Sequence, residues 1–430
     1  MLTLLSDRRY PDCNGTTRRD FLQIGTLGLG ALSLPQLLQA KNKANTAGRV
    51  INNKSVIWVW LGGGPTHVET FDPKMSAPVE YRSTTGEVQT PVAGMALGGS
   101  FPEMAKLGDK LAVVRSFAHG SSSHGTGTRW IMTGYKPQGR ESNKPSIGSI
   151  VSKVGGTFSP ETGMPTYVRM SNINGDGAAF LGPRFGPFNP SGDAAKNMTT
   201  RLPTDRVADR RELLGQLDRI DRKIDSTGRM NGIDGFEQQA FNLILGQAKE
   251  AFGTKGESSK TTARYGKRFG QSLLSARRLC EAGASFVTVS SGGWDMHSNV
   301  ERSIKSRGAE IDKGVSALIE DLHERGMQDD VLVVVTGEFG RTPRINKRAG
   351  RDHWGNLCTL ALSGGGLNMG QVVGRSSPKA EVPATTPIRP HDLLATIFQL
   401  YGIPQKQQVI DFAGRPVYLL ENGEPIKELV

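Results

Sequence analysis

Short apolar runs alternate with helical patterns along most of the chain, and this alternation limits the fold more than any other feature. Five runs have the length and composition of strands: Val56–Leu61, Leu111–Phe117, Phe286–Ser290, Val331–Thr336 and Leu357–Leu362. Helical periodicity covers Arg206–Asp225, Gly235–Ala251, Gly270–Ala282, Ile304–Arg325 and His391–Tyr401. A continuous apolar run of this length suits a strand that is buried on both faces, as in a parallel sheet. The pattern therefore predicts an α/β fold with a mostly parallel central sheet.

Polar and irregular sequence separates the second predicted strand from the third. We therefore expect residues 50–136 and 266–430 to form two parts of one α/β domain, with 137–265 as an insertion or helical subdomain. A chain of 430 residues, 37% of them hydrophobic, buries enough surface to need no disulfide scaffold. Cys280 lies in a helical pattern and Cys358 in a strand-like run, which predicts two buried free thiols.

The first forty residues have the order of a secretory signal. The pair Arg18-Arg19 precedes the mildly apolar stretch Gln23–Leu38, which is too short and too weakly apolar for a stable membrane span. Paired arginines favour the twin-arginine export route and a periplasmic or otherwise exported protein, although an ordinary amphipathic N-terminal helix is the alternative. We expect cleavage between about residues 40 and 47, where Ala40 and Ala47 are both possible sites although neither completes an Ala-x-Ala pattern. We expect no stable transmembrane helix in the mature form.

The chain carries an excess of positive charge. Its formal net charge is +12, and removal of residues 1–40 takes away four arginines and three aspartates, which leaves +11. The basic residues are scattered and lack the aromatic interleaving or module of a nucleic-acid-binding surface, so we expect no nucleic-acid partner. The charge instead suits the attraction of an anionic ester or a sulfated polysaccharide.

Metal-capable side chains gather in the loops that follow or flank the predicted strands. In open α/β sheets, ligands bind beyond the carboxyl ends of the strands. Five of the seven histidines lie in these loops: His67, His119, His124, His297 and His353. Imidazoles mixed with carboxylates suit zinc or manganese, whereas carboxylates alone suit calcium or magnesium. The pattern favours a metal site, with polar loop packing as the alternative.

Several motifs resemble those of the bacterial family called domain of unknown function 1501. They are Gly62-Gly63-Gly64-Pro65-Thr66-His67 with Phe71-Asp72-Pro73-Lys74, Ala276-Arg277-Arg278-Leu279, Gly293-Trp294-Asp295-Met296-His297, Gly337-Glu338-Phe339-Gly340-Arg341-Thr342-Pro343 and Gly350-Arg351-Asp352-His353-Trp354. That family is similar to the alkaline phosphatase and sulfatase superfamily. The resemblance implies a doubly wound α/β sandwich with one or two divalent metal ions at the strand ends. Zinc or manganese is favoured and calcium or magnesium stays open.

The superfamily pattern, laid on this chain, also implies site residues. The implied metal ligands are His67, Asp72, Asp295, His297, Glu338, Asp352 and His353, where His67 is a substitute for Asp72. The nucleophile position, about ten residues before Thr133-Gly134, falls on His124. Ser123 or Thr126 would then supply the hydroxyl at a helix start. Arg341 is expected to bind an ester oxygen, with a salt bridge to a neighbouring acid as the alternative.

The chain departs from the superfamily pattern at the nucleophile and at one metal histidine. It lacks the Cys-x-Pro-Ser-Arg motif of sulfatases, and Glu338-Phe339-Gly340 supplies a carboxylate but no histidine. The expected function is an exported metal-dependent hydrolase that acts on a phosphate or sulfate ester, such as a sulfated or phosphorylated saccharide. A non-catalytic or differently specialised binding component of an exported complex on the same scaffold is the alternative. The oligomeric state stays open.

Overall fold

The computed structural model describes residues 51–137, 144–190, 250–411 and 414–430. The chain divides at Val50, and the following account concerns the unit Ile51–Val430. The predicted twin-arginine signal lies outside the described residues. So do the predicted helix over Arg206–Asp225 and nearly all of the one over Gly235–Ala251.

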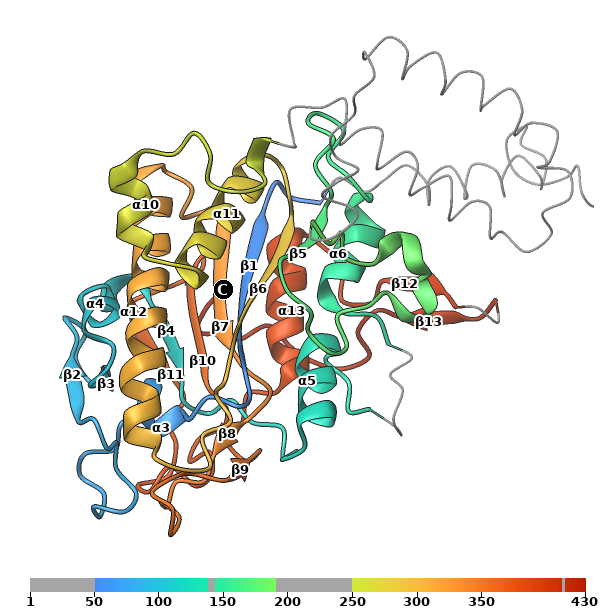
Figure 1. The fold of residues 1–430 in the computed structure, drawn as a ribbon. Helices are drawn as coiled ribbons and strands as arrows, with labels where there is room; N and C mark the ends of the chain where they lie inside the picture. Colours follow the sequence, from blue (N-terminus) through green and yellow to red (C-terminus); the bar gives the residue numbers. More distant parts are fainter. Residues whose placement is uncertain (1–50, 138–143, 191–249, 412–413) are drawn as a thin grey trace, which may run out of the picture. The chain divides into compact units, whose positions relative to one another are not determined.

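A seven-stranded sheet forms the centre of this unit, in the order β11-β4-β10-β7-β1-β6-β5 (Figure 1). Its strands are β1 (Ser55–Gly62), β4 (Ala112–Val114), β5 (Tyr167–Arg169), β6 (Phe286–Gly292), β7 (Val331–Thr336), β10 (Leu360–Gly364) and β11 (Gln371–Val373). Within this sheet only β10 runs antiparallel to its neighbours, and the other pairs are parallel. The predicted α/β class with a mostly parallel sheet is therefore confirmed.

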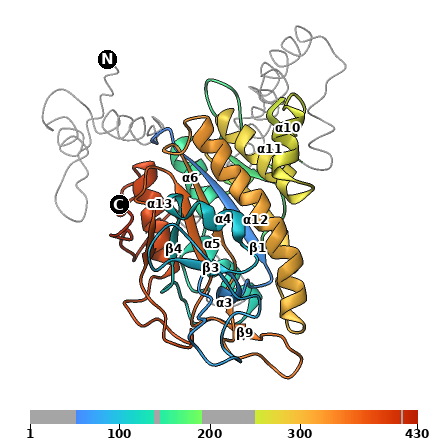
Figure 2. The ribbon, with the colours of Figure 1, turned by 90° about the vertical axis from the view of Figure 1, so that its left-hand side faces the viewer.

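Helices cover both faces of the sheet, because the central strand is apolar on both sides. In β1, Ile57, Val59 and Leu61 face a core built with α4 (Pro102–Lys106), α11 (Phe269–Glu281) and α12 (Val300–Glu324). Its alternate residues Val56, Trp58 and Trp60 face α5 (His124–Thr133), α6 (Ile147–Gly155) and α13 (Pro390–Tyr401). Figures 1 and 2 show the resulting layers, with helices on each side of the strands. This is a three-layer α/β sandwich.

Short elements complete the described chain. They are α3 (His67–Thr70), β2 (Glu87–Gln89), β3 (Ala96–Gly98), β8 (Gly340–Arg341), β9 (His353–Trp354), α10 (Ser259–Tyr265), β12 (Gln408–Ile410) and β13 (Pro416–Tyr418). Single 3-10 turns lie at Gly108–Lys110, Ala179–Leu181 and Pro183–Phe185. No helix in the described residues combines the length and the hydropathy that a membrane span requires.

The predicted elements agree with the structure best where the apolar runs are long. β7 has the predicted bounds, and β1, β6, α11 and α13 end within two residues of them. The prediction over Leu111–Phe117 is too long, since only Ala112–Val114 pairs in the sheet. β5 and β11 were not predicted, because three residues carry too little periodicity to show a strand. Cys280 and Cys358 are buried free thiols, as predicted.

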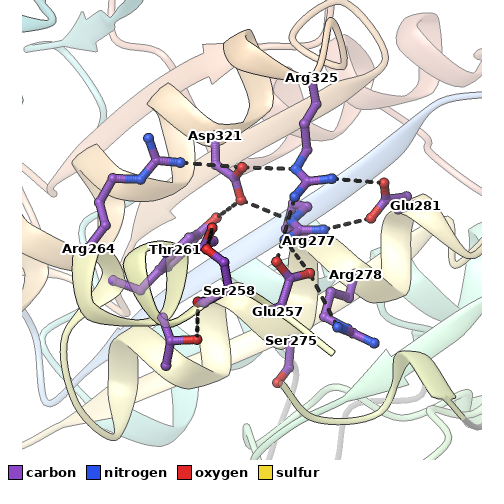
Figure 3. Close-up of polar contacts among 12 residues, drawn as sticks. Glu257, Ser258, Thr261, Arg264, Ser275, Arg277, Arg278, Glu281, Asp321 and Arg325 are labelled. Carbon is purple, nitrogen blue, oxygen red and sulfur yellow. Dashed lines mark hydrogen bonds and ion pairs between the residues drawn. The ribbon is translucent and has the colours of Figure 1, made fainter. Parts of the chain in front are cut away.

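An ion-pair network joins α10, α11 and α12 on one side of the sheet (Figure 3). The side chain of Arg277 is fully buried and contacts three carboxylates, at Glu257, Glu281 and Asp321, at 2.6–3.0 Å. Arg325 on α12 also reaches Asp321, at 2.9 Å. The network neutralises a buried guanidinium and fixes the two long helices against each other.

Candidate metal centre

Loops from distant parts of the chain meet at one edge of the sheet. Asp295 and His297 follow β6, Glu338 follows β7, and His124 begins the helix that follows β4. Because β4, β6 and β7 run in the same direction, their carboxyl ends lie at the same edge. Figure 1 shows α3, β8 and β9 at this edge, below the sheet. The side chains that were predicted at strand ends are thus close in space.

The β8–β9 hairpin brings a further histidine to this edge. The hairpin connects β7 to β10, and β10 begins at the carboxyl edge because it runs opposite to β7. Arg341 pairs directly with His353 across the hairpin. Residues that are opposite each other on antiparallel strands project from the same face. His353 therefore lies beside Asp295 and His297, although it comes before β10 in the chain and they come after β6.

Two histidines meet around one carboxylate oxygen of Asp295, and a third histidine approaches the other oxygen. Asp295 Oδ1 lies 3.0 Å from His297 Nε2 and 3.1 Å from His353 Nε2. The two imidazole Nε2 atoms are 3.1 Å apart. His124 approaches the other oxygen of Asp295, with its Nε2 at 3.6 Å. Ligand atoms of His124, Asp295 and His353 all lie within 4.8 Å of one another, so one small ion can reach all three.

The opposite nitrogen of each imidazole is held by an acceptor. His297 Nδ1 contacts Asp352 Oδ1 at 2.7 Å, and His124 Nδ1 contacts Glu338 Oε1 at 2.7 Å. His353 Nδ1 contacts the carbonyl oxygen of Ser122 at 3.0 Å. Since carboxylates and carbonyls accept hydrogen bonds, each Nδ1–H donates, and a neutral ring then presents a lone pair at Nε2. This arrangement is the one that orients metal-ligating histidines.

Arg341 forms an ion pair with Asp295 from the buried side of the centre. Its side chain is fully buried and donates to Asp295 Oδ1 and to the backbone oxygens of Gly63 and Gly64. Partial burial raises the pKa of Asp295, but the hydrogen bond and charge of Arg341 outweigh this and lower it to about 2. The carboxylate is therefore ionised at neutral pH. The structure shows the salt bridge that was the alternative role for Arg341.

Glu338 is buried behind His124. Its Oε1 accepts hydrogen bonds from His124, at 2.7 Å, and from the backbone N–H of Gly63, at 2.8 Å, whereas Oε2 has no hydrogen-bond partner among the described residues. Gly63 has φ +120°, and a Cβ there would lie 2.5 Å from the backbone nitrogen of Asp295. Only glycine allows this close approach of the two loops. Glu338 thus orients an imidazole and fixes the loop after β1.

A buried ion pair supports the loop that carries Asp352 and His353. Arg351 and Glu69 are both fully buried, with Nη2 and Oε1 2.9 Å apart. Arg351 also donates to the backbone oxygens of Arg82 and Pro343, and its own carbonyl accepts from Arg341. Sequence reasoning missed this pair. The available signal was two charged residues inside the motifs that contain His67 and His353, but sequence does not show that they meet.

The donor set fits a divalent metal ion. With the proton of each ring on Nδ1, three Nε2 lone pairs and the carboxylate of Asp295 would share one small volume, and such groups repel unless a cation or proton lies among them. Arg341 Nη1 lies 3.4 Å from His297 Nε2, but no guanidinium nitrogen is bonded to His353 or His124 among the described contacts. Imidazole nitrogens with a carboxylate oxygen are ligands that suit zinc or manganese. The side chains are 25–46% exposed, so the centre is open to a substrate.

Two residues predicted as ligands are engaged elsewhere. His67 is buried on α3, its Nε2 donates to the carbonyl of Ala380 at 3.0 Å, and burial lowers its pKa to about 4. Asp72 is buried and pairs with Lys74 and Arg115, both at 3.3 Å. In the described part of the chain, neither side chain forms a hydrogen bond or an ion pair with Asp295. The structure brings together His124, Asp295, His297, Glu338, Asp352 and His353 of the predicted residues.

The candidate nucleophiles lie at the start of α5. Ser123 is the N-cap residue of this helix, and its exposed side chain does not cap the helix. Thr126 lies one turn further on and is half-buried. Ser123 directly precedes His124, so its hydroxyl is next to the cluster along the chain. The histidine His119, one loop earlier, is buried and hydrogen-bonds the Glu338 backbone oxygen at 2.6 Å.

Comparison with solved structures finds sulfatases and related enzymes. The PsFucS1 sulfatase from Pseudoalteromonas sp. is 13% identical, with 86% of this chain and 71% of that chain covered and a TM-score of 0.39. The lipoteichoic acid synthase LtaP from Listeria monocytogenes is 12% identical, with coverage of 91% and 82% and a TM-score of 0.35. The phosphonate monoester hydrolase SpPMH from Silicibacter pomeroyi is 13% identical, with coverage of 82% and 74% and a TM-score of 0.32.

The family of the chain follows from its sequence. No curated protein sequence matches it. A family model described as "Protein of unknown function (DUF1501)" matches residues 53–430, which include the whole described sheet and every residue of the candidate metal centre. The motifs predicted this family, and the match confirms it. The chain belongs to the DUF1501 family.

Proposed function

We propose that this protein is a metal-dependent hydrolase of a sulfate or phosphate ester. The observation that carries the proposal is the arrangement of three histidines around Asp295, each with Nδ1 held by an acceptor and Nε2 turned toward the carboxylate. An acceptor at Nδ1 of each ring, with Nε2 on the side of the carboxylate, is the arrangement of histidines that bind a metal ion. The ester class rests on the resemblance of the motifs to the sulfatase and alkaline phosphatase superfamily.

Asp295, His297, His353 and His124 would hold the metal ion. A divalent cation there would supply positive charge beside the ester oxygens and lower the pKa of a nearby hydroxyl. Zinc or manganese matches the mixed nitrogen and oxygen donors best. Asp352 and Glu338 would act as positioning residues, because each contacts the Nδ1 atom of an imidazole, on the side of the ring away from Asp295.

The remaining residues would prepare the site for an anionic group. Arg341 keeps Asp295 ionised and oriented, and its full burial argues for this role over direct binding of an ester oxygen. Ser123 offers an exposed hydroxyl beside His124, and Thr126 is the second candidate nucleophile. A hydroxyl at a helix start and near a cation is activated for attack. In this proposal the paired arginines at Arg18-Arg19 send the folded protein out of the cytoplasm.

Hydrolysis of model esters tests the proposal. The purified protein is incubated with nitrophenyl sulfate, nitrophenyl phosphate and a phosphonate monoester, before and after treatment with a chelator. We expect release of nitrophenol from at least one ester, loss of it on chelation, and recovery on addition of zinc or manganese. His353→Ala is expected to lower the rate by at least about 100-fold, whereas His323→Ala, which removes a histidine from α12, keeps it.

The same experiment separates the second candidate function. Asp295 already has a cationic partner in Arg341, so its charge is balanced without a catalytic metal ion. This favours, as the alternative, a binding component on the same scaffold. Bound metal without hydrolysis of any ester would support that alternative and contradict the hydrolase. Hydrolysis that persists at the full rate in His353→Ala would contradict the assignment of this centre.

A further inference from the structure

A cavity of about 420 Å³ lies at the beginning of α12. Three separate segments of the chain line it, and the lining residues are Thr84, then Asn299, Glu301, Arg302 and Lys305, and then Ile345 and Ala349 from the loop between β8 and β9. The volume falls in the range of about 300–1,000 Å³ that is typical of small-molecule sites. α12 follows β6, so this end of the helix lies at the edge of the sheet that carries the candidate metal centre.

One loop forms both a wall of the cavity and a support of the metal centre. Asn346 stands between the two loop residues that line the cavity, and its Nδ2 donates to Asp352 Oδ1 at 3.2 Å and to the His297 carbonyl at 3.1 Å. A Cβ on Gly350 would lie 2.1 Å from the His297 carbonyl carbon, so the loop packs directly on that histidine. One loop therefore connects the cavity to the centre.

The cavity is basic. Arg302 and Lys305 line it, and Arg344, Lys347 and Arg348 are exposed on the shared loop. Lys305 pairs with Glu301 at 2.6 Å. Within the described part of the chain, none of the four other cations forms an ion pair with a carboxylate. Since Glu301 balances Lys305, Arg302 is the cavity-lining cation without a carboxylate partner in the described residues, and a bound anion would supply that partner.

We propose that the cavity binds a second anionic group of the substrate whose first ester group is at the candidate metal centre. The substrate is then a polyanion, such as an oligosaccharide that carries more than one sulfate or phosphate. Arg302 and Lys305 would donate charge-assisted hydrogen bonds to the second group. The position of the first group rests on the proposed function.

Calorimetric titration of the purified protein tests this inference. The probes are a disaccharide with two sulfates and the same disaccharide with one, and a matching pair that carries phosphates. We expect the doubly charged member of one pair to bind at least about tenfold more tightly than the singly charged member. Arg302→Gln should weaken binding of the doubly charged probe about three- to tenfold, and Arg302→Glu more, with the singly charged probe changed less than about twofold.

Lys260→Gln is the matched control, because it removes an exposed cation from α10. It should leave the affinity for both members of each pair unchanged. Equal affinity for singly and doubly charged probes, or an Arg302→Gln protein that binds as the wild type does, would overturn the inference. If the preference depends on Arg302 but no ester is hydrolysed, the proposed function fails and the anion site stands. If esters are hydrolysed without the preference, only the anion site fails.

Discussion

At the scale of single residues, the centre depends on where each imidazole is anchored. His124, His297 and His353 each have a carboxylate or carbonyl behind Nδ1, and their Nε2 atoms face Asp295. His67 has the opposite environment, since its Nε2 donates to a backbone oxygen and its buried Nδ1 has no hydrogen-bond partner in the part of the chain that the structure describes. Two kinds of histidine that look alike in sequence therefore have different chemistry.

His67 gives a prediction about pH and stability. Burial lowers its pKa from 6.5 to about 4 in the folded protein. Between those values the unfolded chain binds a proton that the folded chain does not, so the free energy of unfolding falls as the pH decreases from 6.5 to 4. The fall in pKa from 6.5 to about 4 corresponds to a loss of about 3 kcal/mol in the free energy of unfolding. Urea unfolding of the wild type at several pH values measures it.

His67→Gln is the variant that isolates this effect, because glutamine retains a donor for the Ala380 carbonyl but does not titrate. The pH-dependent loss should be smaller in the variant by about 3 kcal/mol. His119, whose pKa burial also lowers to about 4, should account for a further part of the loss. An unchanged pH dependence in His67→Gln would show that this imidazole is not buried in its neutral form.

The sequence indicated which residue types gather at the strand ends, but not which of them touch. Asp295, His297 and His353 stand in family motifs near strand ends, and both features predicted that they lie together. Asp72 also stands in a family motif after a strand, yet it pairs with Arg115 and Lys74. The difference arises from the direction in which a loop leaves its strand, which depends on contacts such as Gly63 against Asp295 that no local pattern records.

At the scale of helices and strands, β10 explains the position of His353. A parallel strand in this position would carry its preceding loop to the opposite edge of the sheet. The antiparallel direction brings the β8–β9 hairpin to the metal-capable loops. The sequence predicted a strand over Leu357–Leu362 but not its direction, because an apolar run looks the same either way.

The helix network in Figure 3 gives a prediction at this scale. Arg277 has a fully buried side chain and pairs with Glu257, Glu281 and Asp321. Arg277→Met would leave the buried Asp321 with less compensation and is expected to lower the free energy of unfolding by about 3–5 kcal/mol. Chemical unfolding measures the loss.

Arg278→Met is the matched control for this network. Arg278 is the next residue on α11, is 15% exposed, and forms one ion pair in the described residues, with Glu257, besides a hydrogen bond to the Glu250 carbonyl. It should lower the free energy of unfolding by about 1 kcal/mol or less. Equal losses in the two variants would mean that burial of the Arg277 network does not matter for the packing of α11 on α12.

At the scale of the whole molecule, the sequence predicted the layers well because long apolar runs carry a strong signal. The central strands β1, β6 and β7 and the helices α11 and α13 lie where they were expected. The outer strands β5 and β11 have three residues each, and their pairing depends on neighbours far away in sequence. The same limit applies to the buried pair of Glu69 and Arg351, which supports the centre from two distant motifs.

Together, the two proposals mean that one substrate binds at both the basic cavity and the metal centre. The shared loop contacts both, through Asn346 on one side and the cavity-lining Ala349 on the other. A polyanion bound in this way would be held at two points, which positions one ester at the open side of Asp295. The net positive charge of the chain would also attract such a substrate.

Metal stoichiometry tests the central claim most directly. Elemental analysis of the purified protein, after removal of loosely bound ions, is compared with His297→Ala, His353→Ala and the control His323→Ala. We predict about one zinc or manganese ion per chain in the wild type and the control, and less than about a tenth of that in the two centre variants. Wild-type metal content in both His297→Ala and His353→Ala would contradict a metal centre built on Asp295.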